Sequence, residues 1–378
     1  MTRVALVGAN GHGRWHRRRL AHRHDITFVG IAEPNPVDPD PPVPPGTPVF
    51  PNHRDLLAAT RPDVVVICTP PGTHLPIALD ALAAGCDLLL EKPPLLSLAD
   101  HDLLSAALAE SGRSCQVGFQ ALGSAALDEL RAAIAAGALG TVTGIAAVAS
   151  WQRDDAYYAR SPWVGRRGVD GALTNPLAHA VMQALAVAPA TPGLLEVERY
   201  RTRPIESDDT AVMRLTVQGG PIVVVAVTLA GEEFIAGELT VTGTRGSATL
   251  EYPTDRLRLP GDAGPREVPG RVDLLDNLLA HRADRSGVRL RAALSATAGF
   301  TAVVEALGAA PLPTALGDDL VADIGTGPGR IRSIRGINAV LRRAAEGLAL
   351  PSELGVPWAG PPHTENRMQT TGSVAHQK

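Results

Sequence analysis

The sequence is poor in cysteine, lysine and aromatic residues, and it has no long uninterrupted hydrophobic run. Of its 378 residues, three are cysteine and 3% are aromatic, and only two of its 35 lysine and arginine residues are lysine. The odd number of cysteines, without metal-ligand spacing, argues against a disulfide framework, and we expect no metal site. Because no apolar run could cross a bilayer and no signal-peptide pattern precedes the first strand-like run, we expect a cytoplasmic protein without membrane partners.

A strong excess of one charge is also absent. The chain carries 35 basic and 39 acidic residues, a formal net charge of −4, whereas nucleic-acid surfaces usually show a basic excess. We therefore expect no nucleic-acid partner. Hydrophobic residues make up 45% of the chain, which is enough to form real cores and excludes wholesale disorder. At this length two domains are the natural expectation.

Strand-like and helical segments alternate through the first 120 residues. Apolar runs predict strands at residues 3–7, 26–33, 63–70, 87–93 and 113–119. Helical patterns between these runs predict crossover connections and a parallel, doubly wound sheet of the α/β class. Residues 34–48 are an exception, because their many prolines exclude a helix or a central strand. We expect an extended surface loop there.

The pattern changes after residue 120. Helices are predicted at 124–137, around 175–187, and at 273–282, 289–308 and 331–347. Several strand-like runs joined by short turns lie between residues 195 and 252. They predict an α+β domain with an open, mainly antiparallel sheet and helices on one face. The expected organisation is a first domain at 1–120, a second at 121–357 and a flexible tail at 358–378.

A glycine-rich turn joins the first strand to the first helix. Gly8, Gly11 and Gly13 lie where backbone N–H groups can meet a pyrophosphate at a helix N-terminus. Asn10 stands where the dinucleotide fingerprint has its second glycine, and its side chain would crowd the closest approach. Glu33, 20 residues beyond Gly13, can accept hydrogen bonds from a ribose diol and would repel a 2′-phosphate, which favours NAD over NADP. The alternative is that these glycines form only a structural turn.

Lysine usage singles out one further position. Lys92 is the only lysine before the C-terminal Lys378, in a chain that otherwise uses arginine. A partly buried lysine can release a proton near neutral pH, whereas arginine cannot. Compositional bias is the simpler explanation, but the place of Lys92 in the chain favours a functional role.

Four motifs together resemble the glucose-fructose oxidoreductase / inositol dehydrogenase / rhizopine catabolism (Gfo/Idh/MocA) family of NAD(P)-dependent oxidoreductases. They are GANGHG near the N-terminus, RPDVVVICTPPGTH at 61–74, AGCDLLLEKP at 84–93 and DGALTNPLAH at 170–179. The resemblance extends to about residue 357. It implies an NAD-binding Rossmann domain, a second domain that binds substrate, and homodimers or homotetramers formed through the sheet of that second domain.

The resemblance also implies roles for particular residues. Lys92 and His179 would face the nicotinamide and the substrate carbinol, and other residues would line the cofactor, namely Thr69, Pro70, Pro71, His74 and Glu91. The chain departs from the family pattern at Asn175, where the family commonly has aspartate, at Met182, where a second aspartate often follows the histidine, and at Gln120, where an arginine is often found. We count Gln120 among the substrate-binding candidates.

Oxidation of a secondary alcohol by NAD needs a group that takes the hydroxyl proton as the hydride leaves. An imidazole has a suitable pKa without perturbation, so our hypothesis makes His179 the general acid/base. Lys92 would hydrogen-bond the reacting oxygen and stabilise alkoxide charge. Asn175, four residues before His179 on the predicted helix, would share its face and hold substrate hydroxyls or orient the imidazole. The alternative for His179 is a hydrogen-bonded core histidine.

Residues 151–168 form a loop rich in aromatic and arginine side chains. Tyr157, Tyr158 and Trp163 offer faces for a sugar-like polyol, and Arg166 or its neighbour Arg167 could bind a substrate carboxylate or phosphate. An interdomain or subunit contact explains the same residues equally well.

The leading hypothesis is an NAD(H)-dependent oxidoreductase acting on a secondary alcohol or ketone of a sugar, inositol or related polyol. Two alternatives stay open. One is an NAD-dependent glycosidase or lyase that oxidises its substrate transiently, and the other is a non-catalytic NAD(H)-binding sensor.

Overall fold

The computed structural model describes residues 1–188, 193–216 and 219–366. The chain divides into two compact units. Unit 1 comprises Met1–Gln120 and Val272–Ala298, and unit 2 comprises Ala121–Arg271 and the chain from Gly299 onward. The division is therefore discontinuous, whereas the sequence predicted one uninterrupted second domain over 121–357.

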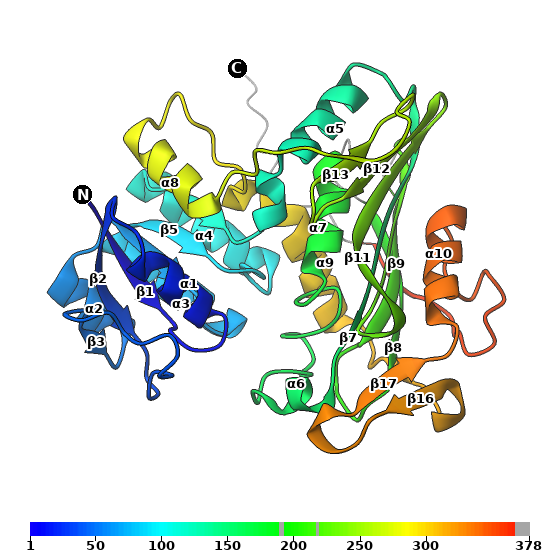
Figure 1. Ribbon diagram of the computed structural model, residues 1–378, viewed down its shortest axis with the longest axis horizontal. Coiled ribbons are helices and arrows are strands. Elements are labelled where there is room, and N and C mark those ends of the chain that lie inside the picture. Colours follow the sequence, from blue (N-terminus) through cyan, green and yellow to red (C-terminus); the bar gives the residue numbers. More distant parts are fainter. Residues whose placement is uncertain (189–192, 217–218, 367–378) are drawn as a thin grey trace. The chain divides into compact units, whose positions relative to one another are not determined.

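Unit 1 contains a six-stranded parallel sheet with the order β3-β2-β1-β4-β5-β6, seen in Figure 1. Its strands are β1 (Thr2–Val7), β2 (Ile26–Ala32), β3 (Val49–Phe50), β4 (Val64–Ile67), β5 (Asp87–Leu90) and β6 (Cys115–Val117). Its helices are α1 (Gly13–Ala21), α2 (His53–Thr60), η1 (Pro71–Thr73), α3 (His74–Ala83), α4 (Leu98–Ser111), α8 (Leu274–Ala283) and η3 (Leu294–Thr297). Every residue of β4 and β5 is buried, as expected for parallel strands covered on both faces. The predicted Rossmann arrangement is confirmed, and residues 34–48 form neither helix nor strand.

The segment 272–298 belongs to unit 1 because it covers the edge strand β6 and the neighbouring face of the sheet. The side chain of Gln116 on β6 is fully buried, donates to Asn277 Oδ1 at 2.7 Å and accepts from the Ala292 N–H at 2.9 Å. The Val117 N–H also donates to the Ala292 carbonyl at 2.7 Å. An uncovered edge strand would leave such groups unpaired, and no local sequence pattern shows which distant segment pairs with them.

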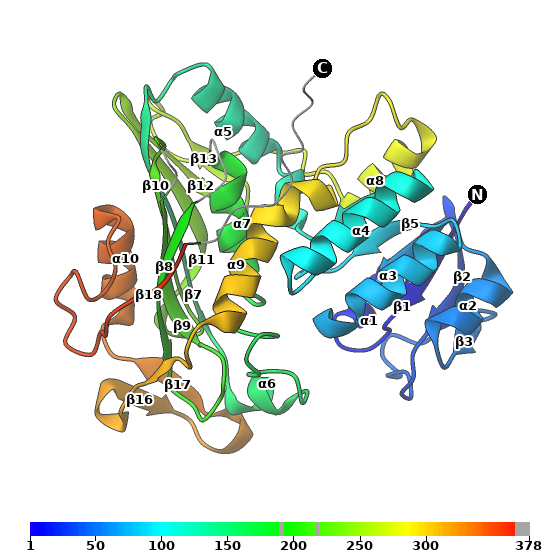
Figure 2. The same cartoon turned by 180° about the vertical axis from the view of Figure 1, so that it is seen from behind.

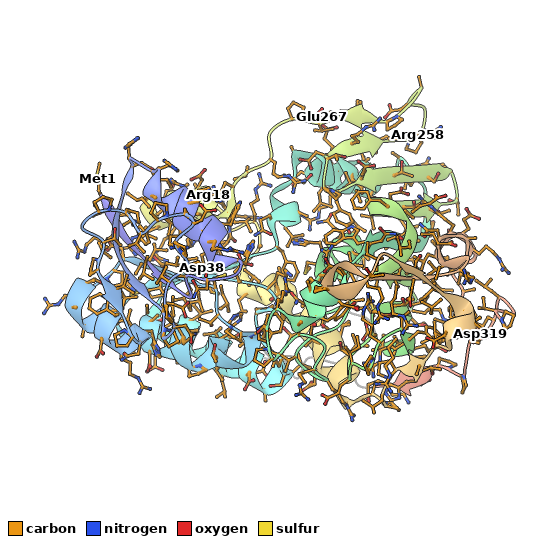
Figure 3. The ribbon with its side chains drawn as sticks, turned by 60° about the horizontal axis from the view of Figure 1, so that its bottom comes forward. Met1, Arg18, Asp38, Arg258, Glu267 and Asp319 are labelled. Atoms are coloured by element: carbon orange, nitrogen blue, oxygen red, sulfur yellow. The ribbon has the colours of Figure 1, made fainter. Side chains whose placement is uncertain are left out.

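Unit 2 contains a mixed, mainly antiparallel sheet of ten strands within the described residues. The path is β14-β13-β12-β11-β7-β10-β9-β8-β15, with β18 paired to β8, and the pairs β7–β10 and β8–β15 are parallel. The strands are β7 (Val142–Gln152), β8 (Leu194–Arg201), β9 (Thr210–Thr216), β10 (Ile222–Thr228), β11 (Ala230–Gly243), β12 (Gly246–Glu251), β13 (Arg256–Arg258), β14 (Arg266–Glu267), β15 (Thr314–Ala315) and β18 (His363–Glu365). Figure 3 labels Arg258 and Glu267 at the β13 and β14 end of this sheet. The predicted α+β class is confirmed.

Helices lie on both faces of the large sheet, not on one face as predicted. The helices that lie wholly or mostly in unit 2 are η2 (Gln120–Gly123), α5 (Ala125–Ala135), α6 (Asp155–Ala159), α7 (Ala178–Val187), α9 (Ala298–Ala309), η4 (Asp318–Leu320), η5 (Gly327–Gly329) and α10 (Ile337–Gly347). Figures 1 and 2 show α7 and α9 along one face and α10 along the other. Side chains alternate along a strand, so Val224 and Ala226 of β10 pack into a core with Ile337 and Leu341 of α10.

The C-terminal third differs from the prediction in three places. The predicted helix at 331–347 begins only at Ile337, because residues 331–334 form strand β17 (Ile331–Ile334), which pairs with β16 (Val321–Ile324). Residues 289–293 of the predicted helix 289–308 are not helical. The predicted tail is ordered at its start, because Trp358 packs against the α10 core and β18 pairs with β8. Residues 367–378 lie outside the described residues.

Candidate functional site

The turn between β1 and α1 is shaped by glycines that no other residue could replace. A Cβ on Gly8, whose φ is +89°, would lie 2.2 Å from the Cys68 carbonyl oxygen, and one on Gly13 would lie 2.0 Å from the Gly8 oxygen. Gly11 also has a positive φ, and within the described residues its Cβ position opens onto free space. Within the described residues, no side chain caps the start of α1, and its first turn carries no acidic residue. The positive end of this helix therefore suits an anion such as a pyrophosphate.

Glu33 lies at the end of β2 and connects the glycine turn to the proline-rich loop. Its buried carboxylate accepts from the Ala9 N–H at 3.0 Å and from the backbone and side-chain nitrogens of Asn35, each at 3.1 Å. The acid thus stands at the position that the dinucleotide fingerprint requires, although these contacts already occupy part of its hydrogen-bonding capacity.

Asn10 holds the proline-rich loop against the glycine turn. Its Nδ2 donates to the Pro36 carbonyl at 3.0 Å, and its Oδ1 accepts from the Asp38 N–H at 2.9 Å. The amide is thereby directed at residues 36–38, which gives a structural reason for asparagine at this position.

Arginines of α1 hold the same loop. Arg17 is fully buried and donates to the Asp38 carbonyl at 2.8 Å, and Arg18 lies 3.8 Å from the carboxylate of Asp40. Figure 3 labels Arg18 on α1 and Asp38 in the loop. A run of three basic residues at 17–19 would by itself favour a solvated helix face, but Arg17 is buried because the loop covers it in the tertiary structure.

Glu91, Lys92 and Pro93 follow β5 at the carboxyl edge of the sheet. The buried Glu91 carboxylate accepts a hydrogen bond from the Lys92 N–H at 3.3 Å, and its Oε1 lies 2.8 Å from His16 Nε2 and 3.6 Å from His12 Nε2. Burial opposes ionisation of Glu91, but the two imidazoles outweigh it and hold its pKa well below the ordinary value. A Cβ at position 118 would lie 2.6 Å from the carboxylate, so Gly118 leaves room for it. The half-buried Lys92 is thus carried by a tightly held segment.

The segment after β4 contains the predicted cofactor-lining residues Thr69, Pro70, Pro71 and His74. The two ring nitrogens of His74 lie 2.9 Å from the Thr69 carbonyl and 3.1 Å from the Pro94 carbonyl. Burial lowers the pKa of His74. Its imidazole therefore joins this segment to the one that carries Lys92.

In unit 2, Asn175 is held by Asp170, which was not among the site residues predicted from the sequence. Asn175 Nδ2 donates to Asp170 Oδ1 at 2.9 Å, and Asp170 Oδ2 accepts from the Gly165 N–H at 2.7 Å. Asn175 lies in the turn before α7, which begins at Ala178, so the predicted helix start near 175 was wrong and the two side chains do not share one helix face. His179 lies in the first turn of α7 and is half-buried.

In the aromatic loop of unit 2, residues 151–168, arginine side chains lie over the aromatic rings. Tyr157 and Tyr158 of α6 contact each other edge to face at 5.2 Å, and Arg160 lies over the Tyr157 ring at 4.0 Å and 6.0 Å from the centre of the Trp163 ring. Burial raises the pKa of Tyr157 to about 12. The exposed Arg166 donates to Glu206 at 2.7 Å, so a substrate anion would compete with that carboxylate. Gln120 is half-buried at the start of η2.

Unit 2 also has a surface pocket of about 720 Å³ beside α6, the helix that carries Tyr157 and Tyr158. It is lined by α6 and by the turn between β16 and β17, including Asp155, Asp323 and Arg330. Among the described residues that line it, none is a site residue predicted from the sequence.

The two units thus combine a dinucleotide-type Rossmann fold with a mixed-sheet fold that carries the Asn175–His179 segment. Residues 2–119 match the family model described as oxidoreductase family, NAD-binding Rossmann fold, and residues 127–249 match that of the GFO/IDH/MocA C-terminal domain. The chain belongs to the Gfo/Idh/MocA family, and NAD is the cofactor of its first unit.

Curated relatives match over part of their length. The rhizopine catabolism protein MocA of Rhizobium meliloti is 30% identical over 160 residues, which are 42% of this chain and 49% of that protein. Inositol 2-dehydrogenase of Gluconacetobacter diazotrophicus is 33% identical over 129 residues, which are 33% of this chain and 35% of that protein. The matches thus span half or less of these relatives.

Solved structures share the fold over most of the chain. The WlbA dehydrogenase from Bordetella pertussis, in complex with NADH and UDP-GlcNAcA, has a TM-score of 0.69 and 22% identity over 81% of this chain and 95% of that chain. An inositol dehydrogenase homologue from Azotobacter vinelandii, complexed with NADH and myo-inositol, has a TM-score of 0.65 and 20% identity over 80% and 93%. Among the described residues, no helix is both long and apolar enough to span a membrane.

Proposed function

We propose that the protein is an NAD(H)-dependent oxidoreductase that moves hydride between the nicotinamide and a secondary alcohol or ketone of a sugar, inositol or related polyol. The observation that carries the proposal is the carboxyl edge of the unit 1 sheet. There a glycine turn and Glu33 suit a dinucleotide, and Lys92, the single interior lysine, is the second residue after β5.

Bound NAD supplies the hydride acceptor, and the chain supplies the proton chemistry. His179 takes the proton of the substrate hydroxyl in oxidation and returns it in reduction. Lys92 donates a hydrogen bond to the reacting oxygen, and its positive charge stabilises the developing alkoxide. Asn175 cannot act as a base, but its amide is oriented by Asp170 and offers an oxygen to a substrate hydroxyl.

The substrate class is supported by the relatives and neighbours. Inositol 2-dehydrogenase and D-glucoside 3-dehydrogenase are among the curated relatives, and fold neighbours were solved with myo-inositol and with UDP-GlcNAcA. The proposed substrate contacts in unit 2 are Tyr157, Tyr158, Trp163 and Arg166. A further proposed substrate contact, Gln120, lies at the end of the first segment of unit 1.

The test is a screen of sugars, inositols and sugar acids with NAD, in which NADH formation is followed and products are analysed. Lys92→Met and His179→Ala should each lower kcat at least about a hundredfold on the substrate found. His363→Gln, which changes a histidine on strand β18 of the same unit, serves as the control and should retain full turnover.

Three outcomes would contradict the proposal. Full turnover by both variants would remove the assigned roles. Product formed without net NADH would favour the glycosidase or lyase alternative, and tight NADH binding without turnover across the panel would favour a sensor.

A homodimer or homotetramer formed through the large sheet is also part of the proposal. The helix α10 packs on β7, β10 and β11, so the pairing surface would have to lie toward β12 and β13. Light scattering at several concentrations tests it, and a mass of one chain at all concentrations would contradict it.

A further inference from the structure

Three potential ligand side chains of unit 1 converge on one point. His12 is the N-cap residue of α1 and His16 lies one turn further along, so their rings meet on the same side of the helix. The Glu91 carboxylate approaches from the end of β5. The nearest ligand atoms of the three residues all lie within 4.8 Å of one another.

The convergence goes beyond an ordinary histidine–carboxylate pair. One imidazole is enough for such a pair, as in His53 and Asp80, where the nitrogen–oxygen distance is 2.8 Å. Here His16 already forms a 2.8 Å contact with Glu91 Oε1, and His12 Nε2 approaches the same oxygen at 3.6 Å. This grouping was not expected from the sequence, although two histidines four residues apart at a helix start are a recognisable metal-ligand spacing.

Aromatic packing holds both imidazoles in place. Trp15 stacks on the His12 ring at 5.6 Å and contacts the His16 ring edge to face at 4.9 Å. The Arg19 guanidinium in turn lies over the Trp15 ring, 4.4 Å from its centre. Rings held in this way lose little conformational freedom when they bind a ligand.

The donor set selects the kind of ligand. Two imidazole nitrogens and one carboxylate oxygen suit Zn²⁺ and related transition-metal ions, whereas Mg²⁺ and Ca²⁺ prefer oxygen ligands. With metal–ligand bonds of about 2.0–2.1 Å, ligand atoms of a tetrahedral site lie about 3.3 Å apart. The His12–Glu91 distance of 3.6 Å is near this value, and the 2.8 Å His16–Glu91 contact would have to lengthen by a few tenths of an ångström.

We propose that His12, His16 and Glu91 form a binding site for a divalent transition-metal ion, with Zn²⁺ as the preferred ion. Glu91 is the anionic ligand, and its Oε1 is the atom that both imidazoles approach. The His12 side chain is 55% exposed, which leaves an approach for the ion and a fourth position for water. The site does not depend on the proposed hydride transfer, and its test needs no turnover.

The experiment uses the full chain after treatment with a chelator, without cofactor or substrate. Zn²⁺ binding is measured by calorimetry, and Co²⁺ is used as a spectroscopic probe whose visible absorption bands identify tetrahedral coordination. We expect one ion per chain and the intense bands of a four-coordinate site. His12→Ala should weaken Zn²⁺ binding at least about tenfold, since even the loss of an outer partner of a metal ligand typically costs that much.

Matched variants make the result specific. His53→Gln removes a histidine that contacts Asp80, a carboxylate also bonded by Arg54, in the same unit and should leave Zn²⁺ affinity unchanged. Glu91→Gln should weaken binding further than His12→Ala. If Glu91→Gln fails to fold, as judged by circular dichroism, the exposed His12 variant decides the question alone. Zn²⁺ binding that His12→Ala leaves intact, or the absence of measurable binding, would overturn the proposal.

Discussion

Replacement of Asn10 by glycine separates two accounts of the nucleotide turn. The sequence pattern suggests that the asparagine crowds the pyrophosphate, so glycine should strengthen NADH binding. In the structure the amide instead forms two hydrogen bonds with the proline-rich loop, to the Pro36 carbonyl and from the Asp38 N–H. The φ angle of Asn10 is not positive, so the backbone at this position does not require glycine.

The magnitude follows from these contacts. Each lost hydrogen bond costs about 0.5–1.5 kcal/mol, and both are partly exposed, so Asn10→Gly should lower the free energy of unfolding by about 1–2 kcal/mol. For a unit of this size, that corresponds to a Tm decrease of about 2–8 °C. NADH affinity should fall or stay constant, because the Asp38 region is less firmly held beside Glu33.

Scanning calorimetry and NADH titration by fluorescence test this prediction, with Asn10→Ala as the matched control that lacks the same amide without adding backbone freedom. The alanine variant should show most of the stability loss. A glycine variant that binds NADH more tightly and melts at the wild-type temperature would refute the reasoning.

Three further changes test other contacts. Asp170→Ala releases the Asn175 amide, so kcat/KM should fall about tenfold to a hundredfold, as misplaced substrate contacts do, and steady-state kinetics with wild-type activity would contradict this. Glu91 has a lowered pKa in the folded state, so its stabilising contribution is present above the ordinary value of 4.5 and is lost as the pH falls through the folded pKa. The free energy of unfolding of Glu91→Gln, measured with denaturant, should therefore depend less on pH below 4.5 than that of the wild type. Gln116→Leu leaves the buried Asn277 Oδ1 without this donor and should lower stability by about 2–4 kcal/mol, with faster proteolysis of residues 272–298 if that segment detaches.

Local patterns were sufficient for the class of each unit. Alternating apolar runs and helical segments identify the parallel sheet, because side-chain periodicity and turn residues are properties of neighbouring positions. The glycine turn, Glu33 and the segment ending in Lys92 were found for the same reason, since each lies where a strand ends. The family motifs then indicated NAD and the candidate pair Lys92 and His179.

Long-range contacts decided the rest. The pairing of β6 with the segment at 272–298, the cover that α10 provides on the second sheet face, and the loop that buries Arg17 all join positions far apart in the chain. A side chain such as Asn10 or Asp170 acquires its role from a partner that periodicity does not reveal. The hydrophobic pattern and the turn residues therefore determined which helices and strands form. Buried polar groups must each find a hydrogen-bond partner, and only the tertiary structure brought those partners together.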